Sequence, residues 1–241
     1  MTTTVNTAAP VRAALFDFGG VLTSSVLEGF SAFSHQISGD PKLLLRLLGS
    51  DDRAKRLLVD HEEGRLSHED FEYGLAARLA EAGVDVEADG LIGRMQSHLR
   101  PDTAMLALLA AVRGLGIKVG LVSNSLGRDC YAGYDLPALF DAQAISGVEG
   151  VRKPSRRLYE IACDRLGVQA TEVVMIDDLA QNITAAERLG MRGVVHTDVA
   201  STAAALARLL AVDPDDLHPG ATTGDHVTHS TASGHELEEA R

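Results

Sequence analysis

Tryptophan is absent from this sequence of 241 residues, aromatic residues of any kind make up 4%, and there are only two cysteines. Cys130 and Cys163 stand far apart, so they provide neither a disulfide framework nor the closely spaced ligands of a zinc site. We expect both to be buried thiols in a reducing compartment. At 45% hydrophobic residues, a chain of this length can bury a core without covalent cross-links.

Long apolar segments are also missing. The longest candidate, residues 104–112, is interrupted by Arg113, so no run of 18 apolar residues is available to cross a membrane. Residues 2–6 are polar and lack the layout of a signal peptide. These absences predict a cytoplasmic protein.

Positive charge is in short supply, with 22 lysines and arginines against 34 aspartates and glutamates and a net charge of -12. Such a charge repels nucleic acids and anionic membrane surfaces, so we expect neither as a partner. Half of it lies in residues 212–241, where seven carboxylates are opposed only by Arg241. This acidic, histidine-containing tail has few apolar residues, so we expect it to be disordered, as we do residues 1–11. Nothing in the sequence specifies an oligomeric state.

Strand-like apolar runs alternate with helical segments through residues 12–23 and 101–211. This alternation predicts an α/β core, a Rossmann-like parallel sheet with helices on both faces. Strands are expected near residues 12–17, 117–122, 142–146, 173–177 and 193–196. Helices are expected near residues 102–115, 155–166, 180–189 and 199–211.

Residues 24–100 show no strand signal, but their apolar residues recur at helical spacing. We expect this segment to form a small, all-helical cap domain inserted into the core. Because it follows directly after the first strand, it is placed to cover a site at that strand's end and to exclude water from it.

A carboxylate closes the first apolar run, where Asp17 is followed at once by Phe18, Gly19 and Gly20. The carboxyl ends of parallel strands form the crevice in which open α/β sheets bind ligands. A buried aspartate there is costly unless a cation or backbone N–H groups hold it. Asp17 is therefore the first candidate for chemistry.

Three later segments also end in polar residues, and all should meet Asp17 at the same edge of the sheet. They contribute Ser123 with Asn124, Lys153 before a proline, and the pair Asp177 and Asp178 with Asn182 just beyond.

Each residue type fits phosphoryl transfer. An aspartate such as Asp17 can act as a nucleophile on phosphorus, which divides one difficult displacement into two easier ones. Mg²⁺ bridges carboxylates to a phosphate, and Asp17 with one or both of Asp177 and Asp178 suits it. Lys153 would offset the crowded negative charge.

The polar residues have supporting roles in this interpretation. Ser123 can donate its hydroxyl proton, and Asn124 its amide proton, to the oxygens of the transferring phosphoryl group. Asn182, near the start of the next helix, can orient either the acidic pair or Lys153.

In order and spacing, these four motifs resemble those of haloacid dehalogenase-like (HAD) hydrolases, in the phosphatase branch with a helical C1-type cap, over about residues 12–200. The pattern is similar to that of bacterial sugar-phosphate phosphatases and of the N-terminal phosphatase domain of epoxide hydrolases. The resemblance implies that Asp17 is the nucleophile and a metal ligand, that Ser123 binds phosphate, and that Lys153 is the stabilising cation. It also implies that Asp178 is the acidic metal ligand, with Asp177 beside it. The implied activity is Mg²⁺-dependent hydrolysis of a small phosphorylated metabolite, such as a sugar phosphate, through an aspartyl-phosphate.

One position departs from the family pattern. Two residues after the nucleophile, the phosphatases carry a second aspartate that protonates the leaving oxygen, whereas this chain has Gly19. The backbone carbonyl of Gly19 can still coordinate the metal, but the general acid is missing, a loss that typically costs about 10²- to 10⁴-fold in rate. Either the leaving group is good, or a cap residue or water supplies the proton, or the protein is a poor catalyst.

Other functions stay open. A catalytically weak protein that binds a phosphorylated ligand or a protein partner would also tolerate Gly19. A haloacid dehalogenase needs no proton for its leaving halide, but the adjacent Asp177 and Asp178 repel each other without a cation that such an enzyme does not use. A phosphomutase would need a second proton-handling group near the nucleophile, and Gly19 disfavours it.

Overall fold

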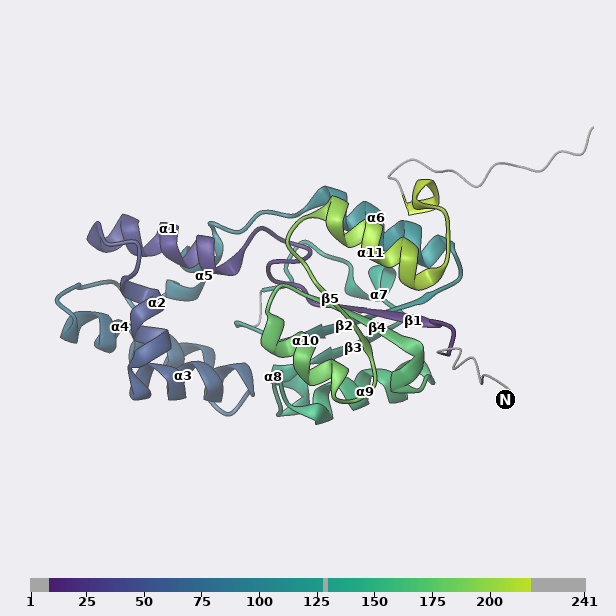
Figure 1. The fold of residues 1–241 in the computed structure, drawn as a ribbon. Helices are drawn as coiled ribbons and strands as arrows, with labels where there is room; N and C mark the ends of the chain where they lie inside the picture. The colour runs from purple at the N-terminus through teal and green to yellow at the C-terminus, as the bar shows by residue number, and fades with distance from the viewer. Residues whose placement is uncertain (1–8, 128–129, 218–241) are drawn as a thin grey trace, which may run out of the picture.

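The structure, a computed structural model, describes residues 9–127 and 130–217. Most of the two segments expected to be disordered, namely residues 1–8 and the histidine-containing residues 218–241, lies outside these ranges. The described residues form a parallel five-stranded sheet with helices on both faces, and a separate group of helices stands at one end of it (Figure 1). The expected α/β fold is thus confirmed.

The strands follow the order β3-β2-β1-β4-β5 across the sheet. The central strand β1 (Ala13–Phe16) pairs with β2 (Lys118–Ser123) and β4 (Val173–Asp177), while β3 (Ala142–Ile145) and β5 (Arg192–Val195) form the edges. All five lie where the apolar runs predicted them. The carboxyl ends of β1, β2 and β4 meet at the same edge of the sheet, so the residues that follow them are neighbours.

Each face of the sheet packs on its own pair of helices, as Figure 1 shows. Ala14 and Phe16 of β1 contribute to one apolar cluster, and Ala13 and Leu15 to the other, because successive residues of a strand point to opposite faces. The first cluster includes α6 (Thr103–Gly114) and α11 (Val199–Leu210), and the second includes α9 (Arg156–Leu166) and α10 (Ala180–Glu187). Short helical turns complete the core: α7 (Leu136–Leu139), α8 (Ser146–Glu149), η1 (Ala170–Glu172) and η2 (Pro214–Leu217).

The core continues past residue 211, where the sequence placed its end. Leu217 of η2 is 1% exposed and packs in the same apolar cluster as α11. Residues 212–217 are ordered because Leu217 packs on this cluster. The acidic composition of the segment gives no sign of that contact.

Five helices lie between β1 and α6 and bury a third apolar cluster of their own. We call them the cap helices: α1 (Val26–Ser38), α2 (Leu43–Ser50), α3 (Asp52–Glu62), α4 (His68–Glu81) and α5 (Leu91–Gln96). The two chain segments that join them to the core run side by side. Thr23 forms a β-bridge with Pro101, and the Asp102 amide donates to the Leu22 carbonyl at 2.9 Å. The cap helices are therefore anchored beside the carboxyl end of β1.

None of the helices in the described ranges is long and apolar enough to span a membrane. Cys130 and Cys163 take part in no disulfide. Cys163 is buried as expected, whereas Cys130 is only half-buried, so the prediction that both are buried was wrong for Cys130.

Candidate active site

Asp17 lies directly after β1 and is buried. Its Oδ1 accepts a hydrogen bond from the Phe18 amide at 2.7 Å and lies 2.7 Å from Nζ of Lys153. Burial raises the pKa of Asp17 to about 7, although Lys153 lowers it, and the nearby Asp177 raises it further. The carboxylate form of Asp17 therefore depends on positive charge close by.

Lys153 is 1% exposed and lies between two carboxylates. Its Nζ is 2.7 Å from Oδ1 of Asp17 and 2.7 Å from Oδ2 of Asp177. Burial on its own would lower the pKa of Lys153, but the two aspartates outweigh it and hold the pKa above its usual value. Lys153 is thus a fixed positive charge in the site.

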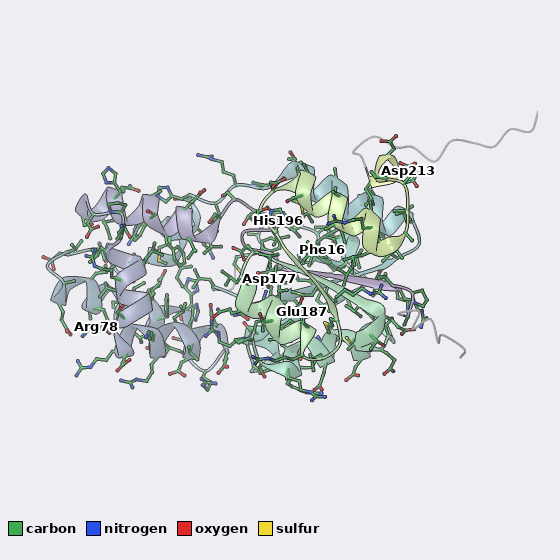
Figure 2. The ribbon with its side chains drawn as sticks, viewed as in Figure 1. Phe16, Arg78, Asp177, Glu187, His196 and Asp213 are labelled. Carbon is green, nitrogen blue, oxygen red and sulfur yellow. The ribbon has the colours of Figure 1, made fainter. Side chains whose placement is uncertain are left out.

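Asp177, the last residue of β4, holds that lysine in place at the end of the sheet that faces the cap helices (Figure 2). Its Oδ2 accepts from Lys153, and its Oδ1 accepts from the Leu179 amide and from Nδ2 of Asn182, both at 2.9 Å. Asn182 therefore orients Asp177, and Asp177 in turn orients Lys153.

The acidic cluster can accommodate a metal ion. Ligand atoms of Asp17, Asp177 and Asp178 all lie within 4.8 Å of one another, and Lys153 is the cation in contact with them among the described residues. Burial, followed by the charge of Asp177, raises the pKa of Asp178 to about 6, while Lys153 lowers it. Three carboxylates and one lysine leave negative charge uncompensated, and an all-oxygen donor set suits a hard divalent cation.

Gly20 makes room for one of these carboxylates. A Cβ atom on Gly20 would lie 2.4 Å from Oδ2 of Asp178, and its φ of +79° is one that glycine adopts readily. The two glycines after Asp17 therefore serve different purposes, and this one lets Asp178 approach the nucleophile loop.

Ser123 is the last residue of β2 and Asn124 follows it, at the same edge of the sheet. Ser123 is buried and borders a cavity that Phe18 and Gly19, the two residues after Asp17, also line. Asn124 accepts from the Lys153 amide through Oδ1 at 2.8 Å and donates to the Lys153 carbonyl through Nδ2 at 3.2 Å. The amide of Asn124 is thus engaged with the backbone of Lys153 and positions the lysine in this arrangement.

Gly19 stands two residues after Asp17, and a side chain at this position would meet a residue of the cap helices. A Cβ atom on Gly19 would lie 2.7 Å from Cγ2 of Val26, the first residue of α1. Contacts below 3.0 Å are not tolerated without a shift of one partner. The absence of a side chain at residue 19 therefore lets Val26 of the cap helices lie close to the loop after Asp17.

A cavity of about 120 Å³ lies between Ser123, Gly19 and the cap helices, and Glu62 is in its wall. Glu62 is the last residue of α3 and is buried. Burial raises the pKa of Glu62 to about 7, although Arg152 and Lys153 lower it. Near neutral pH this carboxyl group can therefore either give or accept a proton.

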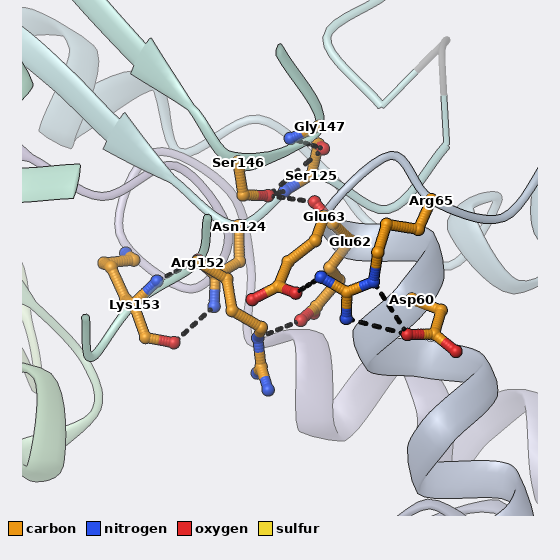
Figure 3. A network of polar contacts seen from close by, with 10 residues as sticks. All are labelled: Asp60, Glu62, Glu63, Arg65, Asn124, Ser125, Ser146, Gly147, Arg152 and Lys153. Atoms are coloured by element: carbon orange, nitrogen blue, oxygen red, sulfur yellow. Dashed lines mark hydrogen bonds and ion pairs between the residues drawn. The ribbon is translucent and has the colours of Figure 1, made fainter. Parts of the chain in front are cut away.

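Two contacts attach the end of α3 to the core. The hydroxyl of Ser146 donates to the Glu62 carbonyl at 2.5 Å, and Nε of Arg152 lies 2.5 Å from Oε2 of Glu62 (Figure 3). Glu62 could not be predicted from the sequence, since no motif marks it and only the packing of the cap helices brings it to the site.

Comparisons with known proteins agree with this arrangement. The sequence matches the family of haloacid dehalogenase-like hydrolases over residues 11–190. It is 28% identical over 202 residues to the sesquiterpene phosphatase astK of Aspergillus oryzae, an alignment that covers 83% of this chain and 96% of that protein.

Two solved structures share the fold. One is a predicted HAD-like family hydrolase from Porphyromonas gingivalis, with a TM-score of 0.66, 20% identity, and coverage of 85% of this chain and 100% of the other. The second is an HAD-family enzyme from Bacteroides thetaiotaomicron in complex with magnesium and inorganic phosphate, with a TM-score of 0.56, 21% identity, and coverage of 78% and 94%. With its sequence, fold and acidic cluster in agreement, the chain belongs to the haloacid dehalogenase-like hydrolases.

Proposed function

We propose that this protein is a Mg²⁺-dependent phosphatase of a small phosphorylated metabolite and that it acts through an aspartyl-phosphate on Asp17. One observation carries the proposal: Asp17, Asp177 and Asp178 meet around Lys153 with an excess of negative charge. Similarity to a protein named as a sesquiterpene phosphatase, and a fold shared with a magnesium and phosphate complex, support it.

In the first step, a carboxylate oxygen of Asp17 attacks phosphorus, and the bond from phosphorus to the leaving oxygen breaks. The Phe18 amide and Lys153 hold Oδ1 of Asp17, which leaves Oδ2 to attack. Lys153 and the hydroxyl of Ser123 offset the charge on the phosphoryl oxygens. Bound Mg²⁺, held by Asp17, Asp178 and the carbonyl of Gly19, would neutralise the remaining charge of nucleophile and phosphate.

We assign the proton of the leaving group to Glu62, which replaces the aspartate that Gly19 lacks. Glu62 shares the wall of the cavity with Gly19 and Ser123, and its pKa, raised by burial to about 7, suits a group that gives up a proton near neutral pH. The proton passes to the leaving oxygen as the phosphorus–oxygen bond breaks, and Glu62 becomes a carboxylate.

In the second step, water attacks phosphorus, and the bond from phosphorus to Asp17 breaks. The proton of the water passes to the solvent, and Glu62 takes up a proton from the solvent, so both Asp17 and Glu62 return to their starting states. The cap helices form the domain that encloses these steps, and the close approach of Val26 to Gly19 limits the entry of bulk water.

The three carboxylates of Asp17, Asp177 and Asp178 favour Mg²⁺-dependent phosphate hydrolysis over dehalogenation and over phosphate binding without catalysis. A haloacid dehalogenase displaces halide from an anionic substrate and gains nothing from the uncompensated charge of Asp177 and Asp178. A non-catalytic phosphate-binding protein would have no use for a buried carboxylate at position 17, which repels a phosphate.

The test is steady-state hydrolysis of acetyl phosphate and p-nitrophenyl phosphate with Mg²⁺ and with EDTA. We expect Mg²⁺-dependent turnover that disappears in Asp17→Asn, while the control Asp213→Asn, an exposed acid remote from the site, behaves like the unmodified protein. Circular dichroism of each variant checks that it is folded. Equal background rates in Asp17→Asn and the unmodified protein would refute the proposal.

A further inference from the structure

The cavity bordered by Phe18 and Gly19, the two residues after Asp17, has one polar end and one apolar wall. Gly19, Ser123 and Asn124 form the end where a phosphate would sit. The remaining wall is largely hydrocarbon, from the cap helices and the adjacent loops: Val26, Phe30, Leu58, Leu99 and Leu126.

Few polar groups in this wall are available to a substrate. The hydroxyl of Thr23 donates to the Ser24 carbonyl and accepts from the Gly20 amide, at 3.0 and 3.2 Å. The side-chain amide of Gln96 donates to the Leu126 carbonyl. Thr23 and Gln96 thus already pair within the protein and offer a substrate hydroxyl little to replace its hydrogen bonds to water. The buried hydroxyl of Tyr131 and the carboxyl group of Glu62 are further polar groups of this wall.

The charges in the cavity wall also disfavour a polar substrate body. Glu62 is the charged side chain among the described residues that line the cavity, and neither lysine nor arginine is among them. A substrate with a second anionic group, such as a carboxylate, would meet no cation in this wall. Sugar phosphates, and phosphate esters that also carry a carboxylate, are therefore poorly matched to this wall.

We propose that the substrate is the phosphate monoester of a short apolar alcohol, aliphatic or prenyl, whose hydrocarbon body packs against Val26, Phe30, Leu58, Leu99 and Leu126. This inference rests on the proposed phosphatase function and specifies its substrate class. Because the phosphate and the hydrocarbon body share this cavity of about 120 Å³, the body is limited to a few carbons. An aliphatic alcohol is a poor leaving group, which is why a proton from Glu62 is needed.

Tyr131 sets the upper limit of chain length. It borders this cavity and also a second one of about 490 Å³, which lies between the turn that joins α3 to α4 and the short helix α8. Removing its ring by Tyr131→Ala would join the two spaces, so the variant should accept a longer hydrocarbon chain.

Substrate preference is the first measurement. We expect kcat/KM for isopentyl phosphate to exceed that for glucose 6-phosphate by about 100-fold or more, with acetyl phosphate as the reference for intact chemistry. Leu58→Gln should reduce this ratio about tenfold. Leu57→Gln is the control, because Leu57 packs against Gly74 of α4 and is not in the cavity wall. For each variant the ratio of kcat/KM for the two substrates is compared, so a smaller fraction of folded protein lowers both values equally and does not change the ratio.

Binding of alkylphosphonates provides a second measurement. With Mg²⁺ present, inhibition should strengthen about fourfold for each added methylene from methyl- to about pentylphosphonate and then level off. In Tyr131→Ala it should continue to strengthen beyond that length.

The outcomes separate the two proposals. Inhibition that does not depend on chain length, or a preference for glucose 6-phosphate while acetyl phosphate is turned over, would overturn the substrate class alone. If acetyl phosphate is not hydrolysed either, the phosphatase proposal fails and the substrate class with it.

Discussion

Glu62→Gln tests the assignment of the leaving-group proton. Glutamine has nearly the size of glutamate, so the cavity keeps its shape, but it cannot transfer a proton. Because the carbonyl of Glu62 holds the Ser146 hydroxyl through the backbone, that attachment of α3 to the core remains. Glutamine at position 62 is uncharged, so the ion pair with Arg152 is lost.

The size of the effect depends on the substrate. A general acid contributes about 10²- to 10⁴-fold when the leaving group needs a proton, so kcat for isopentyl phosphate should fall by that factor. Acetate leaves without a proton, so kcat for acetyl phosphate should change less than about threefold. The effect of the substitution on the two substrates should thus differ by about 2 kcal/mol or more of barrier.

The pH profile gives an independent measurement. Burial raises the pKa of Glu62 to about 7, so kcat for isopentyl phosphate should fall above that pH as the group loses its proton. This limb should be absent for acetyl phosphate, and absent in Glu62→Gln for both substrates. Glu63→Gln, which alters the neighbouring acid that pairs with Arg65, serves as the control. An equal loss for both substrates in Glu62→Gln would refute proton donation and leave Glu62 only the role of attaching the cap.

Three further predictions follow from the site. Gly19→Asp alone should lower activity because its Cβ meets Val26. Combined with Val26→Ala in the Glu62→Gln background, Gly19→Asp should increase hydrolysis of isopentyl phosphate by at least about tenfold relative to Glu62→Gln. If the folded triple variant shows no such recovery, the assigned position of the leaving group is wrong. Burial raises the pKa of Glu62 from 4.5 to about 7, so its contribution to stability is present below pH 4.5 and is lost as the pH rises through 7, up to about 3 kcal/mol. Urea unfolding at pH 5 and pH 8 should show this loss in the unmodified protein, and an equal loss in Glu62→Gln would contradict it. Mg²⁺ at about 100 times its Kd should stabilise the protein by about 2.7 kcal/mol in thermal unfolding, and Asp178→Asn should remove most of that gain, whereas a full gain in the variant would exclude Asp178 as a ligand.

The sequence predicted the sheet because parallel strands are buried on both faces and read as continuous apolar runs. Residues 173–177, for example, are all buried in β4. It predicted that Asp17, Ser123 and Asp177 would be neighbours, since each follows a strand and these strands are adjacent. Adjacency in the sheet is a property of the fold class, so motifs at strand ends can be placed without coordinates.

Side-chain direction could not be predicted in the same way. Asn124 carries polar atoms suited to a phosphate, yet both contact the backbone of Lys153, because the loop that precedes Pro154 passes beside it. Glu62 was missed for a related reason: its place in the site depends on how the cap helices lie on the core, and no periodicity in residues 52–62 encodes that. Contacts between separately folded layers are the part of the site that pattern alone does not give.

Gly19 and Glu62 are connected through the position of the cap. With no side chain at residue 19, Val26 and the start of α1 can lie against the nucleophile loop, since even a Cβ atom there would be 2.7 Å from Val26. The same placement of the cap brings the end of α3 to Ser146 and Arg152, which sets Glu62 in the cavity wall. An aspartate at position 19 would supply an acid but would hold α1 away and withdraw Glu62. In this chain, therefore, Val26 of the cap helices occupies the space that an aspartate at position 19 would need. The absence of that aspartate is what allows Glu62 to reach the cavity wall.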